Sequence, residues 1–252
     1  MHRFFVEPSQ IKEKEIIITG PDVNHIRNVL RMRTGEEVLV SNGQGTDFHC
    51  KLTDICEASV TASMMWRLDG NAELPCPITL FQGLPKGDKL EWIIQKCVEL
   101  GAVRIVPMRT RRAVVKLDAK KEQARQKRWM GISKSAAKQS GRGMVPKIGP
   151  VLDFSQAVRE AAELDVCLIP YELAEDMEHT REICSAIRPG QSVGILIGPE
   201  GGFEEAEVAE AIEAGAKPIT LGQRILRTET AGMALISVLA YLLEGQENFT
   251  EQ

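Results

Sequence analysis

The spacing of apolar residues predicts two kinds of structure along the chain. Before about residue 70, short stretches rich in β-branched and aromatic residues alternate with turn segments such as NGQG at 42–45. Strands are predicted at 15–19, 36–41, 47–55 and 59–66. A helix is predicted within 20–35, where Pro21 suits a first turn and Val23, Ile26, Leu30 and Val29 share one face. Short strands with one helix indicate a small β-barrel.

Beyond residue 77, continuous apolar runs alternate with helical periodicity. Strands are predicted at 78–84, 103–107, 166–170, 193–198 and 218–222, and helices at 86–101, roughly 118–140, 204–215 and 230–245. This alternation predicts an α/β domain with a parallel sheet covered on both faces. The segment 68–77 has the composition of a linker. We therefore expect two domains, at 1–70 and 71–252.

Composition and charge narrow the function classes. The six cysteines form no CxxC pair, and the histidines lie near no cysteine pair, so a zinc site is not expected. No apolar run is long enough to span a bilayer and no signal peptide is evident, so we expect a cytoplasmic protein without a membrane partner. Residues 104–147 hold fourteen Lys or Arg against two acidic residues, whereas 150–215 hold three Arg against fifteen Asp or Glu. This asymmetry favours a polyanion partner such as nucleic acid, although a solvated helix face also explains a basic segment.

Two glycine-containing segments follow predicted strands, where ligands of parallel α/β sheets bind. The first is LIGPEGG at 196–202, and the second is TLGQRILRTETA at 220–231. Both the GxxxxGK[ST] and the GxGxxG patterns are absent, and Glu204, Glu205 and Glu207 would repel phosphate. The first loop thus favours a neutral or cationic ligand, or is simply a tight turn that needs glycine. We expect the two strands to be neighbours.

The second segment combines a helix start with unexplained arginines. Thr228 is expected to cap the following helix, with Glu229 in its first turn. Arg224 and Arg227 precede that helix, where positive charge opposes the helix dipole, so capping does not explain them.

Taken together, LIGPEGGF and LGQRILRTETA resemble the SPOUT class of RNA methyltransferases. The chain is most similar to the family (RsmE type) that methylates N3 of a uridine in 16S ribosomal RNA. RFFV at 3–6 and HIRNVLRMRTGEEV at 25–38 resemble its PUA-like barrel, and the segments at 83–101 and 138–142 resemble its central part. Arg111 and Arg112, and Lys134 and Lys138, depart from the family pattern by adding positive charge.

The resemblance implies a C-terminal α/β domain with a deep trefoil knot, a homodimer, and S-adenosyl-L-methionine as cofactor. Its methyl donor is a phosphate-free sulfonium, which an acidic loop does not repel. The expected cofactor-binding residues are Leu196, Gly198, Glu200, Gly201, Leu221, Gly222, Ile225 and Leu226; Leu196 and Leu221 are alternatively ordinary strand core.

The same resemblance suggests roles at the RNA. Glu229 is the candidate base for the N3 proton, with Arg142 and Arg227 stabilising the uracil anion or holding its phosphate. A helix-cap role remains the alternative for Glu229. The expected RNA-binding residues are Arg3, His25, Arg31, Arg33, Arg111, Arg112 and Arg142; each is alternatively a solvated charge, and His25 a helix-face histidine. The expected partner is 16S rRNA in the small ribosomal subunit.

Three other functions compete with this prediction. A SPOUT enzyme acting on a ribose 2′-hydroxyl or a tRNA base would share the loop motifs. A non-catalytic RNA-binding assembly factor would have no need of the intact glycine loop. A nucleotide hydrolase is disfavoured by the missing lysine loop.

Overall fold

The chain folds into two compact units. The computed structural model describes residues 1–69, 72–115, 118–171 and 177–244 of the 252-residue chain. The N-terminal unit comprises Met1–Glu73 and Ala137–Val145, and the C-terminal unit comprises Leu74–Ala136 and Pro146–Gln252. The predicted domain boundary after residue 70 differs from this division, because it does not include residues 137–145 in the N-terminal unit. Residues 70 and 71 of the predicted linker, and residue 245 of the last predicted helix, lie outside the described residues.

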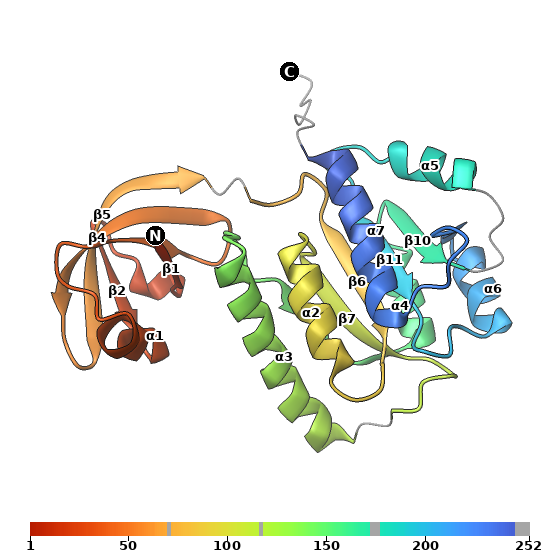
Figure 1. The fold of residues 1–252 in the computed structure, drawn as a ribbon, viewed down its shortest axis with the longest axis horizontal. Coiled ribbons are helices and arrows are strands. Elements are labelled where there is room, and N and C mark those ends of the chain that lie inside the picture. The colour runs from red at the N-terminus through yellow and green to blue at the C-terminus, as the bar shows by residue number, and fades with distance from the viewer. Residues whose placement is uncertain (70–71, 116–117, 172–176, 245–252) are drawn as a thin grey trace. The chain divides into compact units, whose positions relative to one another are not determined.

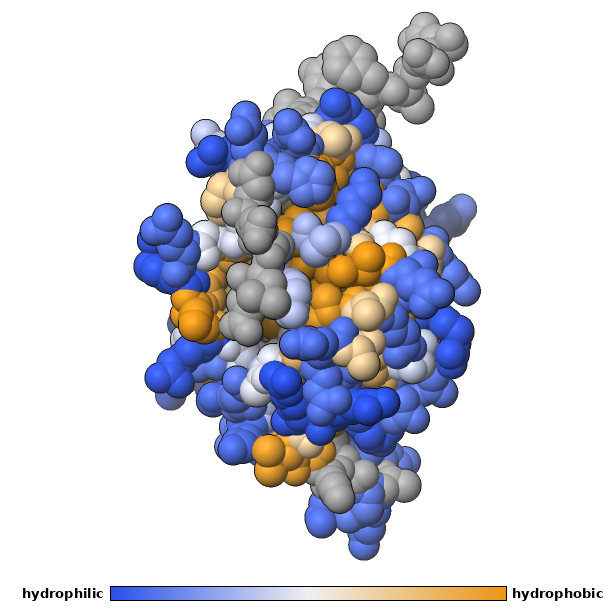
Figure 2. Space-filling view, turned by 90° about the vertical axis from the view of Figure 1, so that its right-hand side faces the viewer, coloured by the Kyte–Doolittle hydropathy of each residue, from blue (hydrophilic) through white to orange (hydrophobic). Residues whose placement is uncertain are grey.

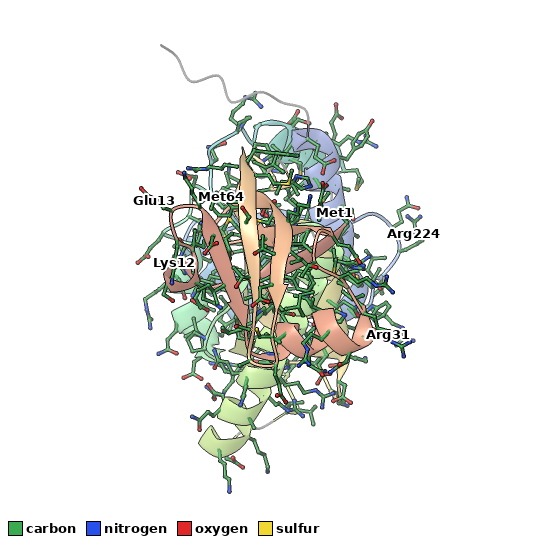
Figure 3. The ribbon with its side chains drawn as sticks, turned by 90° about the vertical axis from the view of Figure 1, so that its left-hand side faces the viewer. Met1, Lys12, Glu13, Arg31, Met64 and Arg224 are labelled. Carbon is green, nitrogen blue, oxygen red and sulfur yellow. The ribbon has the colours of Figure 1, made fainter. Side chains whose placement is uncertain are left out.

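The N-terminal unit is built on a curled five-stranded sheet (Figures 1 and 3). Its elements are β1 (His2–Phe5), η1 (Pro8–Gln10), β2 (Glu15–Thr19), α1 (Pro21–Asn24), η2 (His25–Val29), β3 (Glu37–Ser41), β4 (Thr46–Ile55) and β5 (Ser59–Asp69). The strand order is β1-β3-β4-β5-β2; β1 and β3 are parallel and the other pairs are antiparallel. The predicted strands are therefore present, and β5 runs three residues beyond its predicted end.

The predicted helix at 20–35 is shorter than its pattern suggested. It consists of α1 and the π-helical turn η2, and it ends before Arg31, which has a left-handed φ of 53°. Val23 and Ile26 are buried under the sheet, but Val29 is 64% exposed. The wider π turn places Val29 on the solvent side, so its assignment to the buried face was wrong.

Residues 137–145 complete the N-terminal unit through buried polar contacts. The Arg142 guanidinium is 2% exposed and forms an ion pair with Glu73. Arg3 pairs with Asp47 at 2.7 Å and donates to the backbone carbonyl of Arg142 at 2.9 Å. The Ser41 hydroxyl donates to the carbonyl of Gly143 at 2.9 Å. Charges this deeply buried are tolerated only when paired, so Glu73 holds Arg142 in place. The hydrogen bonds from Arg3 and Ser41 fix the segment to the sheet.

The C-terminal unit is a parallel seven-stranded sheet with helices packed around it (Figure 1). Its strands are β6 (Ile78–Gly83), β7 (Arg104–Arg109), β8 (Lys147–Ile148), β9 (Leu152–Asp153), β10 (Val166–Pro170), β11 (Val193–Ile197) and β12 (Lys217–Ile219). Its helices are α2 (Lys89–Glu99), α3 (Ala119–Gln139), α4 (Phe154–Ala161), α5 (Met177–Ser185), α6 (Glu205–Glu213) and α7 (Thr228–Leu243). The last residues of α3 belong to the N-terminal unit.

The sheet order is β12-β10-β11-β6-β7-β8, with β9 also pairing with β7. All of β6 and β11 is buried, as continuous apolar strands of a covered parallel sheet require. The predicted adjacency of the strands at 193–198 and 218–222 was wrong, because β10 lies between β11 and β12. The loops that follow these two strands nevertheless line one cavity.

The helices pack as their periodicity predicts. In α2, Leu90, Ile93, Ile94, Cys97 and Val98 form the buried stripe, and Gly101 ends the helix with a φ of 107°. Figure 2 shows apolar residues gathered between hydrophilic ones on the side of the C-terminal unit that lies at the right in Figure 1. Among the described residues, no helix combines the length and apolar character that a bilayer crossing requires.

Candidate active site

A cavity of about 820 Å³ lies at the carboxyl ends of β10, β11 and β12. Its walls are the glycine loop, defined here as residues 198–203, and the second loop, defined as residues 220–227. The start of α7, the first residue of α2, Arg112, the ends of β10 and β11, Tyr171 and the first residue of α5 also contribute to the lining. The volume falls within the range of pockets that bind cofactors and small molecules. The position is the one that parallel α/β sheets commonly use for ligands.

The glycine loop is shaped by close approach of the backbone. A Cβ at Gly198 would lie 3.0 Å from the carbonyl carbon of Gly202, and one at Gly201 would lie 3.2 Å from Cβ of Arg112. Only Gly202 of this loop has a left-handed φ, at 67°. Two of the three glycines are therefore required by packing rather than by backbone conformation.

A buried polar network fixes the glycine loop to α7. The Thr228 hydroxyl donates to the carbonyl of Gly198 at 2.6 Å, and Gln82 Nε2 donates to the Thr228 hydroxyl at 2.9 Å. Gln82 is fully buried at the end of β6. The predicted capping role of Thr228 was wrong: Arg227 occupies the cap position, and Thr228 is the first helical residue. The threonine hydroxyl is used to hold the loop.

The end of β7 covers the glycine loop from the other side. Arg112 Nη1 donates to the carbonyl of Gly201 at 3.0 Å, and the backbone amide of Arg111 donates to Glu207 at 2.8 Å. Glu207 is 3% exposed and also accepts from the amide of Glu204 at 2.9 Å in a capping box. The acidic residues that follow the loop therefore begin α6 and bind the Arg111 segment, which explains their presence without a ligand.

Three charged side chains meet at the cavity wall. Lys89 Nζ lies 2.9 Å from Glu200 Oε1 and 3.6 Å from Glu229 Oε2. Burial opposes ionisation of Glu200, but hydrogen bonds from Lys89 and from backbone amides outweigh it and hold the pKa of Glu200 below its usual value. The hydrogen bond to Glu200 is the main cause that raises the pKa of Lys89. Lys89 thus lies between two carboxyl groups of the cavity wall.

The comparison with known families agrees with this architecture. A model described as an RNA methyltransferase domain matches residues 72–240, and one described as an RNA methyltransferase PUA domain matches residues 18–62. The ribosomal RNA small subunit methyltransferase E of Bacillus subtilis (strain 168) is 40% identical over 250 residues, covering 97% of this chain and 98% of that protein. The chain belongs to the ribosomal RNA small subunit methyltransferase E family.

Solved structures of relatives carry the cofactor. A ribosomal RNA small subunit methyltransferase E from Neisseria gonorrhoeae, bound to S-adenosyl methionine, matches with a TM-score of 0.84 and 33% identity, covering 96% of this chain and 98% of that one. A Legionella pneumophila protein solved with bound cofactor SAM has a TM-score of 0.83 and 31% identity, covering 95% and 96%. The predicted fold class is confirmed as a PUA-like module followed by a SPOUT methyltransferase domain of α/β type.

The residues of this methyltransferase predicted to bind cofactor are placed in two environments. Gly198, Glu200, Gly201, Leu221, Gly222, Ile225 and Leu226 line the cavity. Leu196 is fully buried in β11 within the hydrophobic core and does not line it. Strand alternation explains the difference, because the side chain of Leu196 packs against the helices that cover the sheet.

The predicted catalytic residues are divided between the two units. Arg227 and Glu229 line the cavity, and the Glu229 side chain is 21% exposed. Arg142 lies in the N-terminal unit, where Glu73 holds its guanidinium. The segment 138–142, which was predicted to supply a catalytic arginine, thus supplies a buried ion pair within the N-terminal unit.

The predicted RNA-binding residues also differ in their surroundings. Arg31 and Arg33 are exposed beside η2, and Figure 3 shows Arg31 at the edge of the N-terminal unit. His25 is half-buried, with its ring 6.2 Å from that of Phe4. Arg3 is 12% exposed and paired with Asp47. Arg111 and Arg112 are exposed. Arg112 contacts the glycine loop, whereas Arg111 contacts Glu204 and Glu207 at the start of α6.

Sequence reasoning missed two polar residues of the site. Gln82 joins β6, the glycine loop and α7, and Lys89 joins the two carboxylates. Each left a signal: Gln82 is the polar residue at the end of an otherwise apolar strand, and Lys89 directly follows that strand's turn. Polar groups at the carboxyl end of a buried parallel strand are expected to face a ligand site or to be paired.

Proposed function

We propose that the protein transfers a methyl group from S-adenosyl-L-methionine to N3 of a uridine in 16S ribosomal RNA. The observation that carries the proposal is the single cavity in which the glycine loop, the second loop and Glu229 converge. Full-length similarity to the Bacillus subtilis enzyme names the substrate class. The small ribosomal subunit is the proposed setting, and the cytoplasm the proposed compartment.

The residues present suit S-adenosyl-L-methionine. The three glycines of the loop add no side chains to the cavity wall, and Leu221 and Leu226 add apolar surface for a purine. The carboxylates of Glu200 and Glu229 suit a cationic ligand, and no phosphate has to be accommodated. When bound, the cofactor supplies an activated methyl group, so the protein contributes orientation and proton transfer.

Glu229 is proposed to accept the N3 proton of uracil. Its Oε2 atom is buried without a hydrogen-bond partner among the described residues, so a lone pair remains for the substrate. Arg227, exposed at the cavity rim, is proposed to stabilise the negative charge that develops on the base or to hold its phosphate. A paired uracil cannot present N3, so the base has to be unpaired or flipped.

The proposed RNA surface is the exposed edge of the N-terminal unit that carries Arg31 and Arg33. The domain division proposed from the sequence assigns RNA binding to residues 1–70 and methyl transfer to residues 71–252. His25, Arg3 and Arg142 stay predictions for RNA contact, and the ion pairs of Arg3 and Arg142 support a structural role for them.

A homodimer is proposed from an apolar face of the C-terminal unit. Helices α2 and α7 pack side by side (Figure 1). Trp92 on α2 is 52% exposed, and Val238 and Tyr241 on α7 are 49% and 85% exposed. Large exposed apolar side chains on adjoining helices favour a protein interface. The trefoil knot implied by the family resemblance remains part of this proposal.

Mass spectrometry of ribosomal RNA from cells lacking the protein tests the function. We expect the loss of one 3-methyluridine from 16S RNA, restored by the wild-type gene. Loss of a ribose methyl or of a tRNA modification would overturn the choice of target.

The role of Glu229 is tested with the purified protein. In single-turnover methylation of small subunits, Glu229→Gln should lower the rate by about 10² to 10⁴-fold. Glu213→Gln, on the exposed side of α6, is the matched control. An unchanged rate for Glu229→Gln would remove this residue from the mechanism, and absence of S-adenosyl-L-methionine binding in calorimetry would favour a non-catalytic assembly factor.

A further inference from the structure

Lys89 connects two parts of the site that are far apart in sequence. It is the first residue of α2, and it contacts Glu200 of the glycine loop and Glu229 in the first turn of α7. Glu200 also accepts from the backbone amide of Lys86, at 3.0 and 3.3 Å to its two oxygens. The turn before α2 therefore binds the glycine loop through the amide of Lys86. The ammonium group of Lys89, at the start of α2, binds the same loop and also lies near Glu229.

The contact with Glu229 differs in kind from the contact with Glu200. At 2.9 Å, Lys89 Nζ donates a hydrogen bond to Glu200 Oε1. At 3.6 Å from Glu229 Oε2, it supplies charge but no hydrogen bond. The buried Oε2 atom has no hydrogen-bond partner in the described part of the chain. A carboxylate in this state is stabilised by a nearby cation while its lone pair stays available to accept a proton.

In the described part of the chain, the rest of the cavity wall does not duplicate this arrangement. The other charged or titratable side chains that line it among the described residues are Arg112, Tyr171, Arg224 and Arg227. Arg112 donates to the carbonyl of Gly201, and neither Arg224 nor Arg227 forms an ion pair with Glu229 in the described structure. Lys89 is thus the cation that geometry assigns to Glu229.

We propose that Lys89 is a positioning residue for methyl transfer: its ammonium group holds Glu229 at the cavity wall while tying it to Glu200 of the glycine loop. The proposal rests on the proposed function. In the step, the N3–H bond of uracil breaks and the proton passes to Glu229. The electron pair left on N3 forms the bond to the methyl carbon, and the pair of the broken carbon–sulfur bond stays on sulfur. A carboxylate that is already oriented meets the substrate proton without rearrangement.

The dependence of the rate on substrate concentration distinguishes this role from a purely structural one. A positioning contact to the base acts on the chemical step, so its loss lowers the rate at saturation without raising the substrate concentration that gives half the maximal rate. Loss of a binding contact would instead raise that concentration.

The experiment measures single-turnover methylation over a range of small-subunit concentrations with saturating S-adenosyl-L-methionine. Lys89→Gln removes the charge but keeps a donor for Glu200; Lys89→Arg restores the charge. Lys217→Met, an exposed lysine at the amino end of β12, is the control. We expect Lys89→Gln to lower the saturating rate about 10-fold and to leave the half-saturating concentration of small subunits unchanged. We expect Lys89→Arg to return the saturating rate towards the wild-type value.

The outcomes separate this inference from the proposed function. An unchanged saturating rate in Lys89→Gln, or a loss confined to small-subunit binding, would overturn the role of Lys89 while leaving the methyltransferase function intact. Absence of methylation by the wild-type protein would instead overturn the proposed function. Melting temperatures within a few degrees of wild type, together with rescue by Lys89→Arg, show that the variants are folded.

Discussion

The hydroxyl of Thr228 donates a hydrogen bond of 2.6 Å to the carbonyl of Gly198, and this bond joins the start of α7 to the glycine loop. Gln82 donates to the same hydroxyl from the end of β6. Three elements are thus held at one buried oxygen: Gln82 lies 146 residues before Thr228, and Gly198 lies 30 residues before it. The cavity depends on this junction, because the glycine loop forms one of its walls.

Replacing Thr228 with Val should loosen the glycine loop. The change removes one hydrogen-bond partner from the Gly198 carbonyl and one from Gln82 Nε2 at a buried position. This loss should lower the free energy of unfolding by about 1–3 kcal/mol. Urea denaturation and calorimetric titration with S-adenosyl-L-methionine should show lower stability and weaker binding. Thr228→Ser keeps the hydroxyl and should be milder, and Thr230→Val, on the exposed side of α7, is the control. Equal binding by Thr228→Val and wild type would refute the junction.

Gly83→Ala should displace the glycine loop from the opposite side. The new Cβ would lie 2.7 Å from both N and Cδ of Pro199, which is closer than real contacts allow. Overpacking of this kind costs about 1–3 kcal/mol and should weaken cofactor binding. Gly131→Ala is the matched control, because nothing lies within 4 Å of its Cβ on α3 and helix propensity predicts a gain of up to about 1 kcal/mol. Similar stability changes for both variants would contradict the close approach of Gly83 and Pro199.

Thiol labelling of the native protein should modify Cys56 and spare the other five cysteines. Cys56 is exposed, whereas Cys50, Cys76, Cys97, Cys167 and Cys184 are buried. Burial raises the pKa of Cys97 to about 12, so its thiolate is scarce at neutral pH. Cys56 itself should react slowly, because its hydrogen bond to Asp54 raises its pKa. Mass spectrometry should find one label per chain before unfolding and six afterwards, and none on native Cys56→Ser.

Tyr241→Glu should dissociate the proposed homodimer. Tyr241 is 85% exposed on α7, and a carboxylate there would be costly to bury against a second copy. Sedimentation velocity should report a dimer for wild type and a monomer for the variant. Ile212→Glu, on the exposed side of α6, should remain dimeric. A monomeric wild-type protein would refute the interface directly.

The double change Arg31→Ala and Arg33→Ala should weaken RNA binding and reduce its dependence on salt. Each lost phosphate contact lowers the slope of log affinity against log salt by about 0.7–0.9. Lys12→Ala is the control, since Figure 3 places Lys12 at the opposite edge of the same unit from Arg31. Filter binding of 16S RNA at several salt concentrations measures both slopes. Equal slopes for the double variant and wild type would place the RNA surface elsewhere.

Part of the fold followed directly from residue periodicity. The stripe of α2, the buried strands β6 and β11, and the boundary of α3 lie within a few residues of their predicted positions. These elements are long or strongly patterned, so local preference and tertiary packing agree. The predicted length and buried face of the helix at 20–35 were wrong, because a π turn ends the helix early and exposes Val29. Apolar spacing along the sequence does not reveal such a turn.

The sequence by itself determined the two kinds of domain, the glycine loop and its partner segment, and the family to which the chain belongs. Local periodicity and short motifs carry that information, because they depend on neighbouring residues. The tertiary structure decided that β10 separates β11 from β12, that Arg142 is paired with Glu73, and that Lys89 lies between Glu200 and Glu229. These relationships depend on the order of the strands and on the pairing of charges that become buried. Residues far apart in sequence meet only after the sheet has formed, so local sequence patterns do not reveal them.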